Sequence, residues 1–165
     1  MTARLAILLA AGSLLGAPPA PAGRAVAITP DSIVGIKLGV PQPRAATLLR
    51  KPIRTDRLED GYLRLVSGAQ RVEVYFRTGT AGAVAVTTWS KLLRTDKQVG
   101  PCSSIAALKR AYGGKLKPFR QANRVVAYRA GNLIFTVGTR ARVGVVALGR
   151  EAASVYVALN APVCS

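Results

Sequence analysis

Few residues of this 165-residue chain could perform catalysis, because it contains no histidine. Histidine is the commonest general base and a frequent metal ligand, so its absence excludes Ser-His-Asp and Cys-His catalysis and the His-Glu-x-x-His zinc helix. One acidic cluster, Asp56, Glu59 and Asp60, could supply the paired carboxylates of a hydrolase. Arg54 and Arg57 stand beside it, which makes ordinary surface ion pairing the favoured interpretation. We therefore predict a non-enzymatic protein without cofactor or metal.

The two cysteines, Cys102 and Cys164, are the other residues with special chemistry. A metal site is disfavoured, because zinc takes four ligands and the chain has no histidine to add. A redox pair would normally lie closer together in the sequence. We predict a structural disulfide, which would close a loop of about 60 residues.

Residues 1–22 have the pattern of a cleavable secretion signal. Arg4 gives a short positive segment, residues 5–17 are apolar, and residues 20–22 are the small residues that a signal peptidase reads. The apolar stretch is too short for a spanning helix, which needs about 20 apolar residues. We predict a protein secreted into the extracellular or cell-envelope space, with one domain over residues 23–165 and no transmembrane segment in it.

Two short helices and a set of strands are expected to position the remaining residues. Apolar spacing predicts helices over residues 42–49 and 105–112, the second with Ser104 as its cap and Gly113 as its end. Alternating apolar residues and turn signals predict strands. These strands are expected over residues 62–65, 72–76, 83–89, 125–129, 133–137, 143–148 and 155–159.

This order of elements occurs twice, so the chain is expected to be a tandem repeat. A shift of 63 residues aligns the two copies, repeat 1 over about residues 30–95 and repeat 2 over about residues 96–160. The predicted fold class is α+β, with two tandem helix-then-three-strands repeats. Their strands are expected to form one antiparallel sheet with both helices on one face.

Residues 38–52, which comprise Leu-Gly, a predicted helix and a Lys-Pro step, carry a resemblance to known proteins. They resemble the opening of the small-protein A family of outer-membrane assembly lipoproteins and are similar to the tandem repeats of β-lactamase inhibitory proteins. Residues 99–113 look like a second copy. The resemblance spans residues 33–148 and implies a binding or scaffold role. It departs from the pattern at Arg50, where glycine is usual, and the several cysteines of the inhibitory proteins are not reproduced.

Positive charge is the strongest functional signal, with 24 Lys and Arg against seven Asp and Glu and a formal net charge of +17. Such a surface attracts polyanions. The longest basic cluster extends from the second predicted helix toward the next strand, and its members are the anion-binding candidates: Lys109, Arg110, Lys115, Lys117, Arg120 and Arg124. An alternative is that the charge reflects genome composition and solubility, which predicts an even scatter over the surface.

The expected partner is an anionic envelope polymer or an acidic protein, bound by a basic surface. Nucleic acid is possible but less favoured, because the protein is expected to be exported and because Tyr112 and Phe119 are few for a stacking platform. The alternative is an inhibitor-like protein that binds an extracellular enzyme through its sheet face. Trp89, Tyr75 and Tyr62 on an exposed sheet face are then the protein-contact candidates, since aromatic residues are favoured at interfaces. Tyr75 is placed on the wet side of its strand, because Glu73, Tyr75 and Arg77 alternate with apolar residues.

Overall fold

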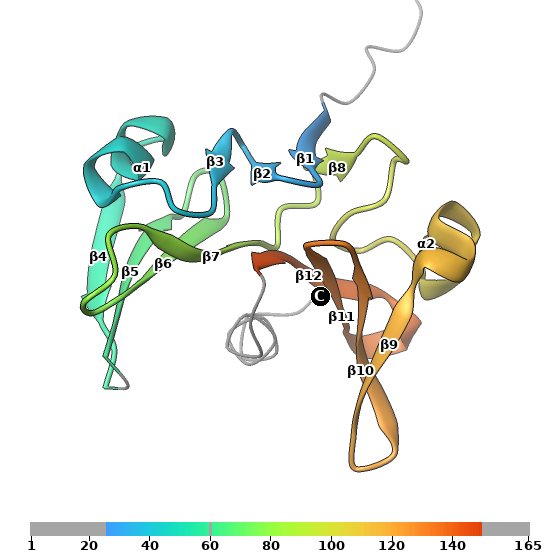
Figure 1. The fold of residues 1–165 in the computed structure, drawn as a ribbon. Helices are drawn as coiled ribbons and strands as arrows, with labels where there is room; N and C mark the ends of the chain where they lie inside the picture. The colour runs from blue at the N-terminus through green and yellow to red at the C-terminus, as the bar shows by residue number, and fades with distance from the viewer. Residues whose placement is uncertain (1–25, 60, 150–165) are drawn as a thin grey trace, which may run out of the picture.

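The computed structural model describes residues 26–59 and 61–149, which form mainly β-strands (Figure 1). The larger of its two sheets has eight antiparallel strands in the order β4-β5-β6-β7-β12-β11-β10-β9. Their bounds are β4 (Ile53–Arg57), β5 (Tyr62–Ser67), β6 (Val72–Arg77), β7 (Ala83–Thr88), β9 (Lys117–Gln121), β10 (Arg124–Ala130), β11 (Leu133–Val137) and β12 (Val143–Gly149). β7 and β12 join the two halves of this sheet, with Thr87 opposite Ala147.

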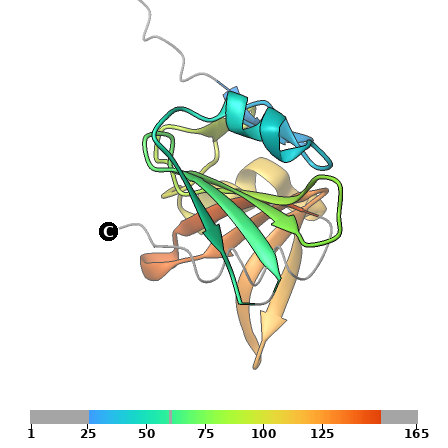
Figure 2. The ribbon, with the colours of Figure 1, turned by 90° about the vertical axis from the view of Figure 1, so that its left-hand side faces the viewer.

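The smaller sheet has four strands in the order β3-β2-β1-β8. These strands are β1 (Val26–Thr29), β2 (Ser32–Ile33), β3 (Ile36–Lys37) and β8 (Arg94–Thr95). Figures 1 and 2 show this sheet over one face of the large sheet, between the two α-helices. That face is therefore covered by α1, the small sheet and α2 together.

Proline, serine and glycine residues set the ends of the two α-helices. α1 (Gln42–Leu48) follows Pro41 and has a proline in its first turn, where a missing N–H costs no hydrogen bond. α2 (Ile105–Tyr112) begins at Ser104, whose Oγ accepts a hydrogen bond from the Ala107 N–H at 3.1 Å. It ends at Gly113, whose φ of 53° lies in the left-handed region that glycine tolerates.

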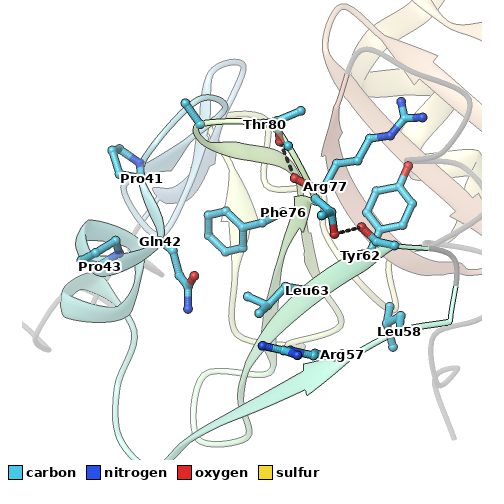
Figure 3. A pocket seen from close by; sticks show the side chains of 14 residues that line it. Pro41, Gln42, Pro43, Arg57, Leu58, Tyr62, Leu63, Phe76, Arg77 and Thr80 are labelled. Atoms are coloured by element: carbon cyan, nitrogen blue, oxygen red, sulfur yellow. Dashed lines mark hydrogen bonds between the residues drawn. The ribbon is translucent and has the colours of Figure 1, made fainter.

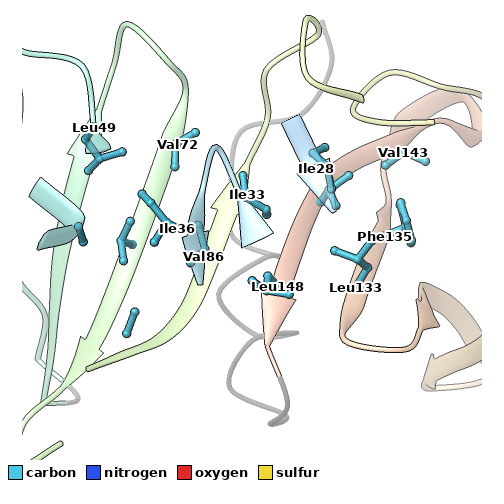
Figure 4. Close-up of a cluster of buried hydrophobic side chains, with 14 of the residues drawn as sticks. Ile28, Ile33, Ile36, Leu49, Val72, Val86, Leu133, Phe135, Val143 and Leu148 are labelled. Atoms are coloured by element: carbon cyan, nitrogen blue, oxygen red, sulfur yellow. The ribbon is translucent and has the colours of Figure 1, made fainter. Parts of the chain in front are cut away.

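The main hydrophobic core lies between the two sheets (Figure 4). Ile28, Ile33 and Ile36 of the small sheet are fully buried. They belong to the same cluster as Val86 of β7 and Leu148 of β12. Burying a side chain of this size contributes about 1.5–3 kcal/mol, so the small sheet helps to hold the seam between the two halves of the large sheet.

The predicted fold class is wrong, because the described chain is mostly β and has two sheets. Two tandem helix-then-three-strands repeats on one sheet do not describe it, since residues 26–37 and 94–95 form a separate sheet in the middle of the covered face. Each α-helix is also followed by strands that were not predicted, β4 after α1 and β9 after α2. The weak spacing of apolar residues was insufficient evidence for a repeat.

Other predictions fall on residues that the structure does not describe. They are the signal peptide over residues 1–22, the strand over residues 155–159 and Cys164. Cys102 is the one cysteine among the described residues. The description as a repeat protein is withdrawn together with the predicted fold class. The predicted disulfide depends on Cys164, which lies outside the described residues, and a location outside the cytoplasm stays a prediction from sequence.

Candidate anion-binding surface

The two halves of the described chain differ in how their charges are balanced. Residues 97–149 contain ten Lys and Arg and no Asp or Glu, whereas residues 26–96 contain six Asp and Glu. The first half provides α1, the small sheet and β4–β7; the second provides α2 and β9–β12. The excess charge is thus not evenly scattered along the chain but concentrated in α2, β9, β10 and the segments beside them.

The most prominent basic element is the β9–β10 hairpin, which we call the arm. It extends away from the rest of the molecule as a two-stranded ribbon (Figure 1). Its two-residue turn consists of Ala122 and Asn123, with φ values of 45° and 62°, and positive φ at both positions is what the tightest hairpin turns require. All five residues of β9 are exposed. β9 is also a terminal strand of the sheet, and Pro118 removes one donor from it, as is usual on edge strands.

The register of the arm sorts its basic residues onto two sides. Directly opposite residues share a side of a sheet and consecutive residues alternate. Lys117 pairs with Arg129 and Phe119 pairs with Ala127, so these four side chains share one side. Arg120, which follows Phe119, lies on the other side.

The other side of the arm faces α2. Pro118 pairs with Tyr128, whose side chain packs against the main core. Lys109 Nζ lies 5.6 Å from the centroid of the Tyr128 ring. Arg120 Nη1 donates a hydrogen bond of 3.4 Å to the Asn123 carbonyl at the turn. The hairpin therefore presents positive charge on both of its sides.

All six anion-binding candidates are exposed, and within the described chain none of them forms an ion pair with a carboxylate. They lie on three neighbouring elements: Lys109 and Arg110 on α2, Lys115 on η1 (Gly113–Lys115), and Lys117, Arg120 and Arg124 on the arm. The structure thus places them in one region but divides those of the arm between its two sides.

Sequence reasoning left four basic residues of this region out of the candidates. Lys97 lies against α2, where its Nζ donates a 2.8 Å hydrogen bond to the Ala111 carbonyl. Arg129 belongs to the arm, and its Nε donates a 2.8 Å hydrogen bond to the Gly131 carbonyl. Arg140 lies within η2 (Thr139–Ala141) and Arg142 directly follows it, and both are exposed. The absence of any acidic residue from position 97 through position 149 is the sequence signal that could have identified them.

The three protein-contact candidates do not form an exposed aromatic surface. Tyr75 is only 4% exposed, so its predicted exposure is wrong. Trp89 is half-buried against the small cluster of Ala127, Ile134, Val145 and Ala147. Tyr62 is half-buried and lies opposite Arg77.

Tyr75 can be buried because its hydroxyl group is hydrogen-bonded within a polar network across β4, β5 and β6. Its hydroxyl donates a 2.5 Å hydrogen bond to Glu73 Oε2. Burial first, and then the neighbouring Glu73 carboxylate, raise the pKa of Tyr75 above its ordinary value. Arg64 bridges Glu73 at 3.4 Å and Asp56 at 2.7 Å. The hydrogen bond from Arg64, with help from Arg54, lowers the pKa of Asp56 despite partial burial.

A pocket of about 600 Å³ lies between the start of α1, the end of β4, the start of β5 and the end of β6. Figure 3 shows Phe76, Leu63 and Gln42 pointing into it, with Arg57 at one end. Tyr62 and Arg77 extend away from its centre. The pocket therefore offers an apolar floor and one guanidinium group, which defines no reaction.

In the described chain, no three metal-ligating side chains gather in one place. No helix of the described residues is long and apolar enough to cross a membrane. No family model, curated protein or solved structure matches this chain. The resemblance to the small-protein A and β-lactamase inhibitory proteins therefore stays a prediction.

Proposed function

We propose that this protein is a non-enzymatic binding module whose basic surface binds an anionic polymer or an acidic protein. The surface consists of α2, η1 and the arm. One observation carries the proposal: residues 97–149 hold ten basic and no acidic residues. A region with this charge attracts polyanions from a distance and holds them by release of their counterions.

The shape of the surface supports the same function. The arm is narrow and extends beyond the body of the protein, so a flexible polymer can contact it from either side. Lys117 and Arg129 lie on one side and Arg120 lies on the other. Because lysine and arginine side chains are long and these are exposed, they can reach successive charges of a chain molecule without a preformed cavity.

The alternative of an inhibitor that grips an enzyme through its sheet face has less support. Tyr75, one of its three expected anchors, is buried and hydrogen-bonded to Glu73. Exposing Tyr75 would break a bond to a buried carboxylate, which costs about 1.5–3 kcal/mol. Trp89 is partly engaged in packing within the protein.

The test is the affinity for inorganic polyphosphate and for poly-L-glutamate, measured by fluorescence anisotropy over a series of salt concentrations. A triple variant, Lys117→Gln, Arg120→Gln and Arg124→Gln, removes three charges from the arm. The affinity for polyphosphate should fall by at least about tenfold at low salt. The slope of log affinity against log salt should decrease by about one for each phosphate that the variant no longer neutralises.

The matched control removes three exposed charges from the first half of the chain, by Lys37→Gln, Arg44→Gln and Lys51→Gln. Both variants have the same net charge, so a difference between them reports location. Equal losses of affinity would show that only total charge matters and would overturn the proposed site. If the unmodified protein binds neither polymer at low salt, the proposed function itself is wrong.

A further inference from the structure

Phe119 is an exposed aromatic residue in the centre of β9. In the described chain only two large apolar side chains are exposed: Phe119 at 42% and Leu92 at 71%. Leu92 lies in the loop before β8, outside the basic surface. An aromatic ring among cations is not explained by solubility or by packing, since neither benefits from leaving it in water.

The residues around Phe119 leave its ring accessible. Its cross-strand neighbour is Ala127, whose methyl group is itself buried and offers little cover. Lys117 and Gln121 precede and follow it on the same side of β9, each two residues away. Two residues of a strand span about 7 Å, so the lysine ammonium and the ring can contact adjacent units of one extended ligand.

Arg129 completes this side of the arm. It lies directly opposite Lys117. Its Nε donates a 2.8 Å hydrogen bond to the Gly131 carbonyl, which restrains the side chain. Its terminal nitrogens form no ion pair with the described residues, so they can bind an anion. A planar guanidinium group binds phosphate oxygens in a fixed geometry, unlike a flexible ammonium group.

We infer that the side of the arm formed by Lys117, Phe119 and Arg129 binds single-stranded nucleic acid, with a base stacked on Phe119 and flanking phosphates on the two cations. The inference rests on the proposed function and names its ligand class. Aromatic rings that alternate with basic residues along a groove or ribbon are the usual means of binding single strands, because every base has a face that can stack.

Other polyanions use this surface less completely. Polyphosphate would contact the cations and leave the ring unused. Duplex nucleic acid keeps its bases paired and stacked on one another, so it cannot offer a base to Phe119. The expected export of the protein makes nucleic acid inside the cell a less favoured partner. It does not change the chemical groups that this side of the arm presents.

The experiment compares four labelled ligands by fluorescence anisotropy: an oligothymidylate long enough to span the arm, its duplex, inorganic polyphosphate and heparin. Three variants of the full chain are used. Phe119→Ala removes the ring, Phe119→Tyr retains it, and Leu92→Ala removes the other exposed apolar side chain as a matched control.

Phe119→Ala should weaken oligothymidylate binding by at least about fivefold, which is the lower end of what loss of one stacked base costs. Phe119→Tyr should restore most of the affinity, and Leu92→Ala should have no effect. The affinity of all three variants for polyphosphate should equal that of the unmodified protein, and unchanged circular dichroism spectra show that the variants are folded.

Three results would overturn the inference while leaving the proposed function intact. They are oligothymidylate binding that is unaffected by Phe119→Ala, duplex binding as tight as single-strand binding, and a Phe119-dependent affinity that is higher for heparin than for oligothymidylate. Failure to bind any of the four ligands would instead overturn the proposed function.

Discussion

The two terminal strands of the large sheet, β4 and β9, are both rich in charge but use it differently. On β4, Arg54 and Asp56 pair with each other, and Asp56 also binds Arg64 on the next strand. On β9, Lys117 and Arg120 have no carboxylate partner within the described chain. One edge of the sheet is therefore neutralised internally, while the other presents positive charge to its surroundings.

The difference shows that net charge alone does not identify a binding surface. The first half of the chain also carries many Lys and Arg, but part of its charge stabilises the fold through Asp56 and Glu73. Residues 97–149 contain no acidic residue with which to do the same. Changes to charge should therefore affect stability in the first half and binding in the second.

The largest effect on stability is expected from Arg64→Leu. The substitution removes the guanidinium group that pairs with both the Asp56 and the Glu73 carboxylates. We expect the free energy of unfolding to fall by about 2–3 kcal/mol, less than for a fully buried pair because water reaches Arg64 and Asp56. Urea denaturation measures it. Arg77→Leu, an exposed arginine on β6, is the control and should change stability by less than about 0.5 kcal/mol.

A smaller effect is expected from acid. Because Arg64 holds the pKa of Asp56 below its ordinary value near 4, this carboxylate contributes stability that is fully present above that value. The contribution is lost as the pH falls through the lowered pKa of the folded state. Urea denaturation at neutral and acidic pH should show less loss in Asp56→Asn than in the unmodified protein. A pH dependence that is unchanged by Asp56→Asn would contradict this role.

The smallest effect on stability is expected from the arm. The triple Gln variant at positions 117, 120 and 124 removes charges that repel one another and pair with no carboxylate within the described chain. The free energy of unfolding should stay within about 0.5 kcal/mol of the unmodified value at low salt. It should not fall when the charges are removed, because mutual repulsion is relieved. A decrease comparable to that of Arg64→Leu would mean that the arm is structural, and the contrast between β4 and β9 would fail.

Elements with strong apolar spacing could be predicted from the sequence. α2 has its predicted bounds, and β11 also matches the prediction, because Ser104, Gly113 and the apolar residues of β11 are clear local signals. β6 and β12 were correct to within one residue. In these segments the local preference and the burial of one face favour the same structure.

Strands without apolar alternation were missed. β9 contains Lys117, Pro118 and Arg120, a composition that indicates a loop and is tolerated here because the strand lies at an edge. β4 likewise has one apolar residue, Ile53, and otherwise contains Arg54, Thr55, Asp56 and Arg57, so it shows no apolar alternation. The two-residue strands of the small sheet are too short for any pattern. Their pairing depends on tertiary contacts, which one sequence does not reveal.

The candidate site was predicted by composition but not by arrangement. Lys117, Arg120 and Arg124 were identified, whereas their division between two sides of a hairpin depended on the unpredicted strand β9. Tyr75 was placed on a wet face because Glu73 and Arg77 alternate with apolar residues. Its burial with Glu73 and Arg64 is a tertiary effect, since the three side chains satisfy one another across neighbouring strands.

The pairing of β7 with β12 separates two kinds of step in the folding of the large sheet. Every other neighbouring pair in that sheet joins strands that are consecutive in the chain, so each half can form from local contacts. Joining the halves requires closure of the loop between Thr88 and Val146, with an entropic cost that no hairpin in the sheet carries. Contacts distant in the sequence slow folding, and we therefore expect the pairing of the two halves to be the slowest step in the folding of this sheet.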